Sequence, residues 1–378
     1  MIAGEASGDL HGAKLIENLK HLAKSPVEIY GVGGDKIRQT GALNFFDLAH
    51  FHATGFTDAI QKIPRYQKAL SRILKDIRSA KPDLVVLIDN PGFNFRLAEK
   101  IHALGIPVVY YIAPQLWAWA KNRVFQMKKW ARKVLVVFDF EKALYEKHGI
   151  PVAFVGHPLK DLIPDVKVKG DRALFESKRA LSPFTLSPFT ISLLPGSRKG
   201  ELKMLLSVFL DAAERIQEKF PRASFQLIQA PTMPREIFDR AIAGRPLSVR
   251  LVDKNSYDAI GASDLAIVCS GTATLECALL KVPMIISYKT SFLTYVAAKS
   301  VIKVPYLGMP NLILGEKKFP ELLQVDATPQ KIADEAIAIL SDRKLRERMK
   351  QDLEEVSRRL GEPGASVRAA QEILMEKY

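Results

Sequence analysis

Residues 84–94 read Leu-Val-Val-Leu-Ile-Asp-Asn-Pro-Gly-Phe-Asn, a run of five apolar residues that ends in an aspartate and a Pro-Gly turn. The apolar run predicts a buried strand, and residues 93–104 predict a helix that Gly105 closes. Three more apolar runs follow, at residues 107–112, 133–138 and 151–155. Fully apolar strands separated by helices are typical of a parallel sheet that is covered on both faces.

The second half of the chain repeats this pattern, with apolar runs at residues 191–194, 224–229, 248–252, 265–268 and 284–287. We therefore expect an α/β protein made of two Rossmann-like, doubly wound domains with an interdomain cleft. The expected boundaries are residues 1–160 for the first domain, 161–340 for the second, and 341–378 for C-terminal helices that pack back on the first. The sequence Leu-Ser-Pro-Phe-Thr occurs twice in succession, at 181–185 and 186–190, which favours an inserted linker over a recognition element.

The formal net charge of +14 indicates an acidic partner. Nucleic acid is disfavoured, because the sequence has no zinc-finger spacing, RNP-like aromatic motif or arginine-rich arm. An anionic membrane surface and phosphorylated small molecules remain. The sequence has neither an apolar run of ~20 residues nor a signal-peptide pattern, so we expect a soluble or peripheral protein. Two cysteines eight residues apart, Cys269 and Cys277, form no metal pair and favour a reducing compartment.

Two segments of the first half contain candidate ligand-binding or catalytic residues. The turn Gly-Glu-Ala-Ser-Gly-Asp at 4–9 leads from a first strand into a helix, and Ser7 or Asp9 is expected to cap that helix or to bind a ligand. Only three residues precede Gly4, so we also expect a short first strand and a less stable first domain. Asp89 ends a strand and is a candidate general base for a sugar hydroxyl, with N-capping of the next helix as the alternative. The glycines at 31–34 lack the full dinucleotide fingerprint.

Two segments of the second half are suited to phosphate. Pro-Gly-Ser-Arg at 195–198 follows a strand and opens a helix, so Gly196, Ser197 and Arg198 are candidate phosphate ligands. Ser270, Gly271 and Thr272 open another helix, and Glu276 is placed to accept hydrogen bonds from ribose hydroxyls. Each segment also fits a plain capped turn, and together they favour a nucleotide diphosphate site.

Neither a metal nor an organic cofactor is expected. No two aspartates lie two residues apart, and none of the seven histidines forms an HExxH pair. Arginine and helix dipoles would then offset the charge of the leaving diphosphate.

Residues 58–79 predict an amphipathic helix whose apolar stripe is flanked by basic residues. This pattern fits a helix lying on an anionic membrane and fits core packing equally well. Residues 292–307 are a weaker candidate for the same contact. Trp117, Trp119 and Trp130 could line an acyl or sugar pocket or could simply pack in the core.

Seven motifs together resemble the lipid-A-disaccharide synthase family along nearly the whole chain. They are Gly-Glu-Ala-Ser-Gly-Asp at 4–9, Ile-Asp-Asn-Pro-Gly-Phe-Asn at 88–94, Pro-Gln-Leu-Trp-Ala-Trp at 114–119, Val-Gly-His-Pro at 155–158, Leu-Leu-Pro-Gly-Ser-Arg at 193–198, Ser-Gly-Thr-Ala-Thr-Leu-Glu at 270–276 and Leu-Gly-Met-Pro-Asn-Leu at 307–312. The resemblance implies a GT-B fold and an inverting, metal-independent reaction. The first domain would bind the acceptor, and the second would bind the UDP-sugar.

The implied donor is UDP-2,3-diacylglucosamine and the acceptor 2,3-diacylglucosamine 1-phosphate (lipid X). The products are the β-1,6-linked disaccharide 1-phosphate and UDP. In the same way Asp89 matches the base, Arg198 a diphosphate ligand and Asn311 a nucleotide-site residue, and Glu5 and Gln115 complete the expected substrate-binding set. The expected location is the cytoplasmic face of the inner membrane, and a homodimer is left open. A UDP-sugar 2-epimerase on the same fold and a membrane-associated scaffold without enzyme activity remain as alternatives.

Overall fold

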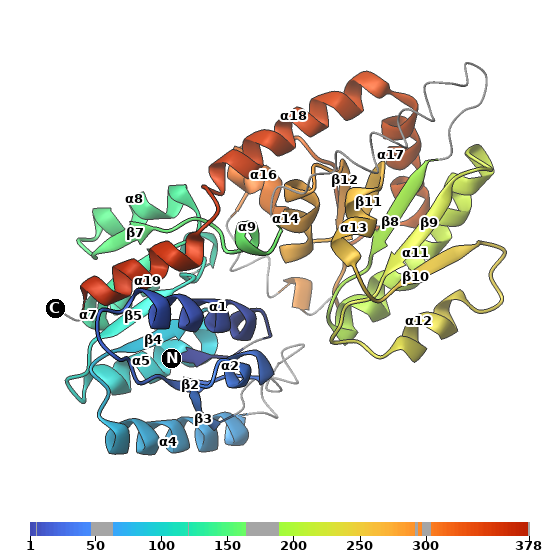
Figure 1. Ribbon diagram of the computed structural model, residues 1–378. Helices are drawn as coiled ribbons and strands as arrows, with labels where there is room; N and C mark the ends of the chain where they lie inside the picture. Colours follow the sequence, from blue (N-terminus) through green and yellow to red (C-terminus); the bar gives the residue numbers. More distant parts are fainter. Residues whose placement is uncertain are drawn as a thin grey trace. The chain divides into compact units, whose positions relative to one another are not determined.

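The computed structural model describes residues 1–4, 6–46, 63–119, 121–163, 189–291, 294–296 and 304–376. It divides the chain into two compact units, the first formed by Met1–Leu162 and the segment from Leu360 onward, the second formed within residues 163–359. Each unit is built around a parallel sheet with helices on both faces (Figure 1). The two-domain α/β expectation is therefore confirmed.

The first unit contains, in its described part, a seven-stranded parallel sheet in the order β3-β2-β1-β4-β5-β6-β7. The strands are β1 (Ile2–Ala3), β2 (Tyr30–Val32), β3 (Leu43–Phe46), β4 (Val85–Ile88), β5 (Val108–Tyr111), β6 (Ala131–Val136) and β7 (Val152–Phe154). The helices are α1 (Ala6–Leu22), α2 (Asp35–Gln39), α4 (Ile63–Ala80), α5 (Pro91–His102), α6 (Leu116–Trp119), the 3₁₀ turn η1 (Lys121–Arg123), α7 (Val124–Trp130), α8 (Asp139–Lys147), α9 (Leu159–Leu162) and α19 (Ala365–Met375).

The second unit has a six-stranded parallel sheet in the order β10-β9-β8-β11-β12-β13 within the described residues. Its strands are β8 (Thr190–Leu194), β9 (Ser224–Ile228), β10 (Val249–Val252), β11 (Leu265–Cys269), β12 (Met284–Tyr288) and β13 (Glu321–Leu323). Its helices are α11 (Lys199–Lys219), α12 (Arg235–Ile242), α13 (Ser256–Gly261), α14 (Thr272–Leu279), α16 (Met309–Leu314), α17 (Pro329–Ser341) and α18 (Arg343–Arg359).

The two sheets share a doubly wound strand order in which the first strand of the unit pairs with the second on one side and the fourth on the other. In such sheets the order reverses beside the first strand, and ligands bind outside the carboxyl ends of the strands at that point. The candidate residues Asp89, Arg198 and Ser270 all follow the carboxyl ends of strands that flank this position.

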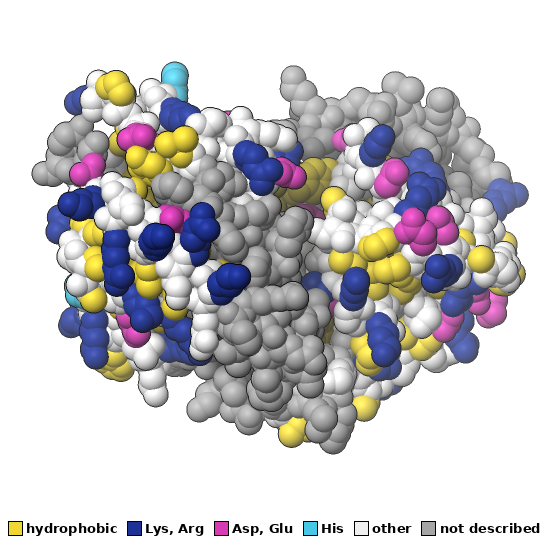
Figure 2. All heavy atoms as spheres, turned by 90° about the horizontal axis from the view of Figure 1, so that it is seen from below, with side chains coloured by type: hydrophobic (Ala, Val, Ile, Leu, Met, Phe, Trp, Pro, Cys, Tyr) yellow, Lys and Arg dark blue, Asp and Glu magenta, His cyan; other side chains and the backbone are white. Residues whose placement is uncertain are grey.

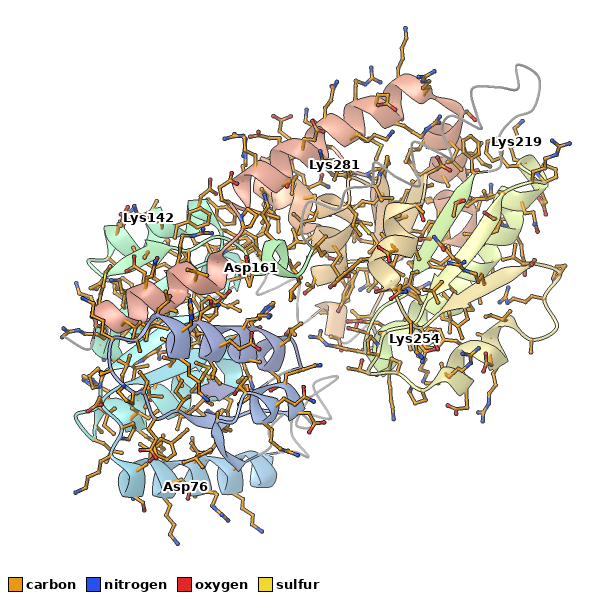
Figure 3. The ribbon with its side chains drawn as sticks, in the orientation of Figure 1. Asp76, Lys142, Asp161, Lys219, Lys254 and Lys281 are labelled. Atoms are coloured by element: carbon orange, nitrogen blue, oxygen red, sulfur yellow. The ribbon has the colours of Figure 1, made fainter. Side chains whose placement is uncertain are left out.

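The C-terminal helix returns to the first unit and packs along α1 (Figure 1). The Asp161 carboxylate accepts hydrogen bonds from the backbone N–H groups of Gly364, Ala365 and Ser366, at 2.6, 3.1 and 3.0 Å, and so caps α19. Figure 3 labels Asp161 where α9 meets the start of this helix. The return begins at Leu360, because α18 still belongs to the second unit, whereas the sequence placed the boundary at residue 341.

The apolar stripe of α4 belongs to the core of the first unit. Ile73, Leu74 and Ile77 are 1%, 8% and 7% exposed and join the cluster formed around β4 and α5. The interpretation of this stripe as a membrane-facing surface is therefore wrong for these residues, and core packing is correct. Ile60 and most of residues 292–303 lie outside the described residues.

The opposite face of α4 is basic and exposed, with Lys68, Arg72, Lys75 and Arg78 pointing outward. Figure 2 views the molecule from the side of α4 and shows Lys and Arg side chains gathered over the left-hand unit. None of the described helices is both long and apolar enough to cross a membrane.

Candidate active site

Asp89 lies at the carboxyl end of β4 in a strained turn. Asp89 and Asn90 have positive φ angles of 48° and 45°, a region that non-glycine residues rarely occupy. The Asn94 side-chain amide and the Tyr110 hydroxyl donate to the Asp89 carbonyl oxygen at 2.7 and 2.5 Å. The Asp89 side chain itself is half-buried. Its backbone is thus held in place at the sheet edge where ligands bind in this kind of fold.

The Gly4 turn lies against the turn at Asp89. A Cβ atom added to Gly4 would overlap Asn90 Nδ2, so any larger residue here would displace the Asn90 side chain. Ser7 is exposed in the first turn of α1, and Gln115 is half-buried after β5. Glu5 lies outside the described residues. The structure therefore brings two of the segments selected from the sequence side by side.

Asp9 has a different role from the one expected. It lies within α1, is 5% exposed, and accepts hydrogen bonds from the backbone N–H groups of Gly34, Lys36 and Ile37 at 2.7, 3.0 and 3.1 Å. It therefore caps α2 rather than α1 and holds the glycine turn after β2. Both carboxylate oxygens are used by the backbone.

The Arg198 side chain is exposed at the start of α11, where it pairs with Glu201 at 3.5 Å. The Glu201 carboxylate also accepts from the backbone N–H groups of Ser197 and Arg198 at 2.9 and 3.3 Å. Gly196 has a φ of 123° and passes so close to Glu201 that a Cβ atom would touch its carboxylate. An internal carboxylate thus accepts hydrogen bonds from the two N–H groups that were expected to bind phosphate. The Arg198 guanidinium and the neighbouring Lys199 are exposed cationic side chains of this turn.

The turn before α14 is the second candidate phosphate site. Gly271 and Thr272 are exposed there, and the Ser270 hydroxyl donates to the Leu307 carbonyl oxygen at 2.8 Å. The first N–H groups of a helix have no intrahelical partner and attract anions. Because β8 and β11 are adjacent, the Arg198 turn and the Ser270 turn leave neighbouring strands at the same edge.

Glu276 is half-buried one turn into α14, where it forms a hydrogen bond with Tyr257. Burial raises the pKa of Glu276, and the bond from Tyr257 counteracts this only in part. Tyr257 was not among the candidate residues predicted from the sequence, because it belongs to no recognisable motif.

Asn311 is fully buried, and its side-chain amide is used within the fold. Its Nδ2 donates to the Phe319 carbonyl and to Glu321 at 2.9 and 2.8 Å, while Oδ1 accepts from the N–H groups of Lys318 and Phe319 at 2.8 and 2.9 Å. Glu321 also accepts from the backbone of Leu307 and Gly308. In this structure Asn311 therefore shapes the loop beside Ser270.

Among the described residues, no group of three or more His, Cys, Asp or Glu side chains is arranged to hold a metal ion. Cys269 and Cys277 are buried free thiols.

The sequence model of the lipid-A-disaccharide synthetase family matches residues 1–375. The lipid-A-disaccharide synthase of Anaeromyxobacter dehalogenans (strain 2CP-C) is 38% identical over 375 residues, which cover 99% of this chain and 96% of that protein. The enzyme of the same name from Syntrophus aciditrophicus is 39% identical over 374 residues, 98% and 95% of the two chains. The chain belongs to the lipid-A-disaccharide synthase family.

This synthase family consists of glycosyltransferases of lipid A biosynthesis, and the chain is accordingly a hexosyltransferase. Solved structures with a similar fold include a UDP-GlcNAc 2-epimerase from Neisseria meningitidis bound to UDP-GlcNAc, with a TM-score of 0.67 and 15% identity over 99% of this chain and 98% of that one. Acinetobacter baumannii MurG has a TM-score of 0.58 and 15% identity over 99% and 98%.

These structural neighbours establish the GT-B type of fold alone, because their sequences are so distant. The epimerase alternative rests only on this shared fold, whereas the synthase family is matched along the sequence. The same match makes the chain an enzyme rather than a scaffold.

Proposed function

We propose that this chain transfers 2,3-diacylglucosamine from UDP to the 6-hydroxyl of 2,3-diacylglucosamine 1-phosphate, releasing UDP and the β-1,6-linked disaccharide 1-phosphate. The observation that carries this proposal is the family match over residues 1–375. The strained turn at Asp89 in the first unit supplies one group that such a reaction needs. The Arg198 and Ser270 turns, which leave neighbouring strands of the second unit, supply the others.

The second unit holds the UDP diphosphate in this proposal. The Arg198 guanidinium and the first turn of α14 offset the charge that develops on the diphosphate as the glycosidic bond breaks. Glu201 already accepts from the N–H groups of Ser197 and Arg198, so the phosphate contacts the arginine side chain rather than this backbone. Glu276 accepts from the ribose hydroxyls, with Tyr257 fixing its carboxyl group.

The first unit supplies the base. The Asp89 carboxylate removes the proton from the acceptor 6-hydroxyl, whose oxygen attacks the anomeric carbon from the face opposite UDP. The new bond forms as the bond to the diphosphate breaks, which inverts the configuration at that carbon.

The proposed reaction is tested by mass detection of the product. Purified protein with both acylated substrates should yield the disaccharide 1-phosphate and one UDP per product, and omission of the acceptor should abolish UDP release. Conversion of the UDP-sugar without an acceptor would point to an epimerase and contradict the proposal.

We further propose that the protein works on the cytoplasmic face of an anionic membrane and contacts it through the basic face of α4, defined by Lys68, Arg72, Lys75 and Arg78. These side chains are exposed while the apolar side of the helix is buried, so the contact is electrostatic.

Charge reversal tests this contact. The triple variant Lys68→Glu, Arg72→Glu and Lys75→Glu should lose most of its binding to vesicles containing phosphatidylglycerol, and wild-type binding should weaken with added salt. The control reverses three exposed charges on α18, Arg343, Lys344 and Arg348, with the same change in net charge. Equal losses in both triple variants would show that only net charge matters, and α4 would not be the contact.

A further inference from the structure

Three aromatic side chains gather where β5 and β6 end in the first unit. Trp117 lies in α6 after β5, and Phe138 and Phe140 follow β6 at the start of α8. The rings of Trp117 and Phe140 meet edge to face with centroids 5.1 Å apart, and Phe138 stacks on Phe140 at 5.5 Å with an interplanar angle of 13°. We call this group the aromatic wall.

The sequence grouped Trp117 with Trp130, but the structure separates them. Trp130 is 3% exposed and packs on Phe95 and Tyr110 in the core. The wall instead reaches the surface, since Phe140 is 37% exposed and Trp117 is half-buried, while Phe138 is buried behind them.

Glu141 forms hydrogen bonds to the buried side of the aromatic wall. Its side chain is fully buried and accepts the Trp117 indole N–H at 2.9 Å and the Phe138 backbone N–H at 3.3 Å. Burial raises the pKa of Glu141 to about 8, and the hydrogen bonds from Trp117 and Phe138 limit the rise. Burying a carboxyl group without hydrogen-bond partners costs free energy. The bonds from Trp117 and Phe138 offset this cost and hold the Glu141 side chain in one position.

This arrangement determines which chemistry the wall offers. The one polar atom of Trp117 points inward to Glu141, and the phenylalanine rings have none. The exposed surface therefore offers hydrocarbon contact without a hydrogen-bond donor or acceptor from these rings, which suits an acyl chain better than a ring of sugar hydroxyls.

The wall also lies beside the proposed base. In the sheet, β5 and β6 directly follow β4, whose carboxyl end carries Asp89. Neighbouring strands are spaced by roughly 4.8 Å, so the wall begins about one strand away from the turn where the acceptor hydroxyl would be deprotonated.

We propose that Trp117 and Phe140 form the surface on which an acyl chain of the acceptor lies, and that Glu141 is a positioning residue that fixes Trp117 in it. This inference rests on the proposed function, because it requires an acylated acceptor.

The test compares two acceptors, 2,3-diacylglucosamine 1-phosphate with long acyl chains and the same compound with four-carbon chains. Phe140→Ser should lower kcat/KM for the long-chain acceptor on the order of 10-fold and change the short-chain value little. Phe140→Leu, which keeps an apolar side chain, should retain most of the preference. The control is Phe125→Ser, a change at another exposed phenylalanine of the same unit.

Glu141→Ala should lose the chain-length preference as Phe140→Ser does, whereas Glu141→Gln should keep most of it, because its amide oxygen still accepts from the indole. A residue that serves folding alone would lower stability in both and leave the preference unchanged. If the wild type forms product but Phe140→Ser lowers kcat/KM equally for both acceptors, this inference alone is overturned. No product from the wild type with either acceptor would overturn the proposed function and this inference together.

Discussion

Asp89 and Asn90 are two consecutive non-glycine residues in the left-handed region, and each such residue costs about 1–3 kcal/mol. The surrounding side chains maintain this conformation, since Asn94 and Tyr110 both donate to the Asp89 carbonyl oxygen. Strain of this kind is kept where a side chain must be presented in a fixed direction. It fits the general-base role proposed for Asp89. The N-cap position of α5 is the next residue, Asn90, and the Asn90 side chain forms no capping hydrogen bond.

Asp89→Asn should lower kcat by about 10²–10⁴-fold with little change in the unfolding midpoint, because it removes the base and keeps the shape of the side chain. Steady-state kinetics with both substrates and urea unfolding measure the two effects. Asp35→Asn, an exposed change in the same unit, is the control and should have normal kinetics. Near-normal turnover of Asp89→Asn would assign the base elsewhere.

Arg198→Ala should lower kcat/KM for the UDP-sugar by about 10²–10³-fold, because the leaving diphosphate loses its cationic partner. Arg198→Lys should restore little of this, since an ammonium group does not reproduce the bidentate geometry. Arg235→Ala is a matched control, because the Arg235 side chain is 56% exposed, against 55% for Arg198, and also pairs with carboxylates. Equal effects in both variants would argue against a specific phosphate contact.

Single residues also show why the candidate site was only partly readable from the sequence. Asp89, Arg198 and Ser270 follow apolar strands, so their position at the sheet edge could be predicted from local pattern. The partners of Asp9 are backbone N–H groups at the start of α2, 25 to 28 residues away along the chain. Those of Asn311 are backbone groups of Lys318 and Phe319 and the Glu321 side chain. Glu201 could have been found, because its spacing of three from Arg198 is that of a capping box.

At the scale of elements, most strands were predictable, including the edge strands β7 and β10, which match the apolar runs at 151–155 and 248–252, whereas β2, β3 and β13 were not. β4, β5, β8 and β11 coincide with apolar runs to within one or two residues, since burial on both faces leaves no polar positions. β2, β3 and β13 have three or four residues each and include a glycine, an asparagine and a glutamate respectively, so they carry no comparable apolar run.

Helix α4 illustrates a different limit. An apolar stripe with basic flanks has the same sequence pattern whether the stripe meets a membrane or a sheet. Only the tertiary structure settles the matter, by placing Ile73 and its neighbours in the core.

Ile73→Ser should destabilise the protein by about 2–5 kcal/mol, because it leaves a cavity and buries a hydroxyl group. Lys75→Ser, on the exposed face of the same helix, should change stability by less than about 0.5 kcal/mol. Urea unfolding followed by circular dichroism measures both. If Ile73→Ser is as stable as the wild type, the apolar stripe of α4 is not packed in the core.

At the scale of the whole molecule, the hydrogen bonds of Asp161 attach the last helix, α19, to the part of the first unit formed by residues 1–162. Burial raises its pKa, but the hydrogen bonds from Ser366, Gly364 and Ala365 outweigh burial, so the pKa of Asp161 lies below its ordinary value of 3.8. A carboxyl group with a lowered pKa in the folded state stabilises the fold above that ordinary value. This contribution is lost as the pH falls through the lower, folded-state pKa.

Asp161→Asn should therefore weaken the docking of α19 at neutral pH, by about 1–2 kcal/mol, and should lose less stability than the wild type on acidification below pH 3.8. Hydrogen exchange of residues 365–375 should accelerate in the variant. Asp342→Asn removes a comparable cap from α18 and should leave exchange in α19 unchanged. Unchanged protection of α19 in Asp161→Asn would mean that packing on α1 alone holds it.

The return of α19 to α1 also sets an order of events during synthesis. Asp161 and Gly364 are 203 residues apart, so at about 5–20 residues per second the ribosome needs roughly 10–40 s to deliver the partner that Asp161 caps. The second unit is synthesised during that interval, while the first still has the α1 surface uncovered. A nascent chain stalled before residue 360 should consequently expose apolar surface on its earliest-made part and bind chaperones there.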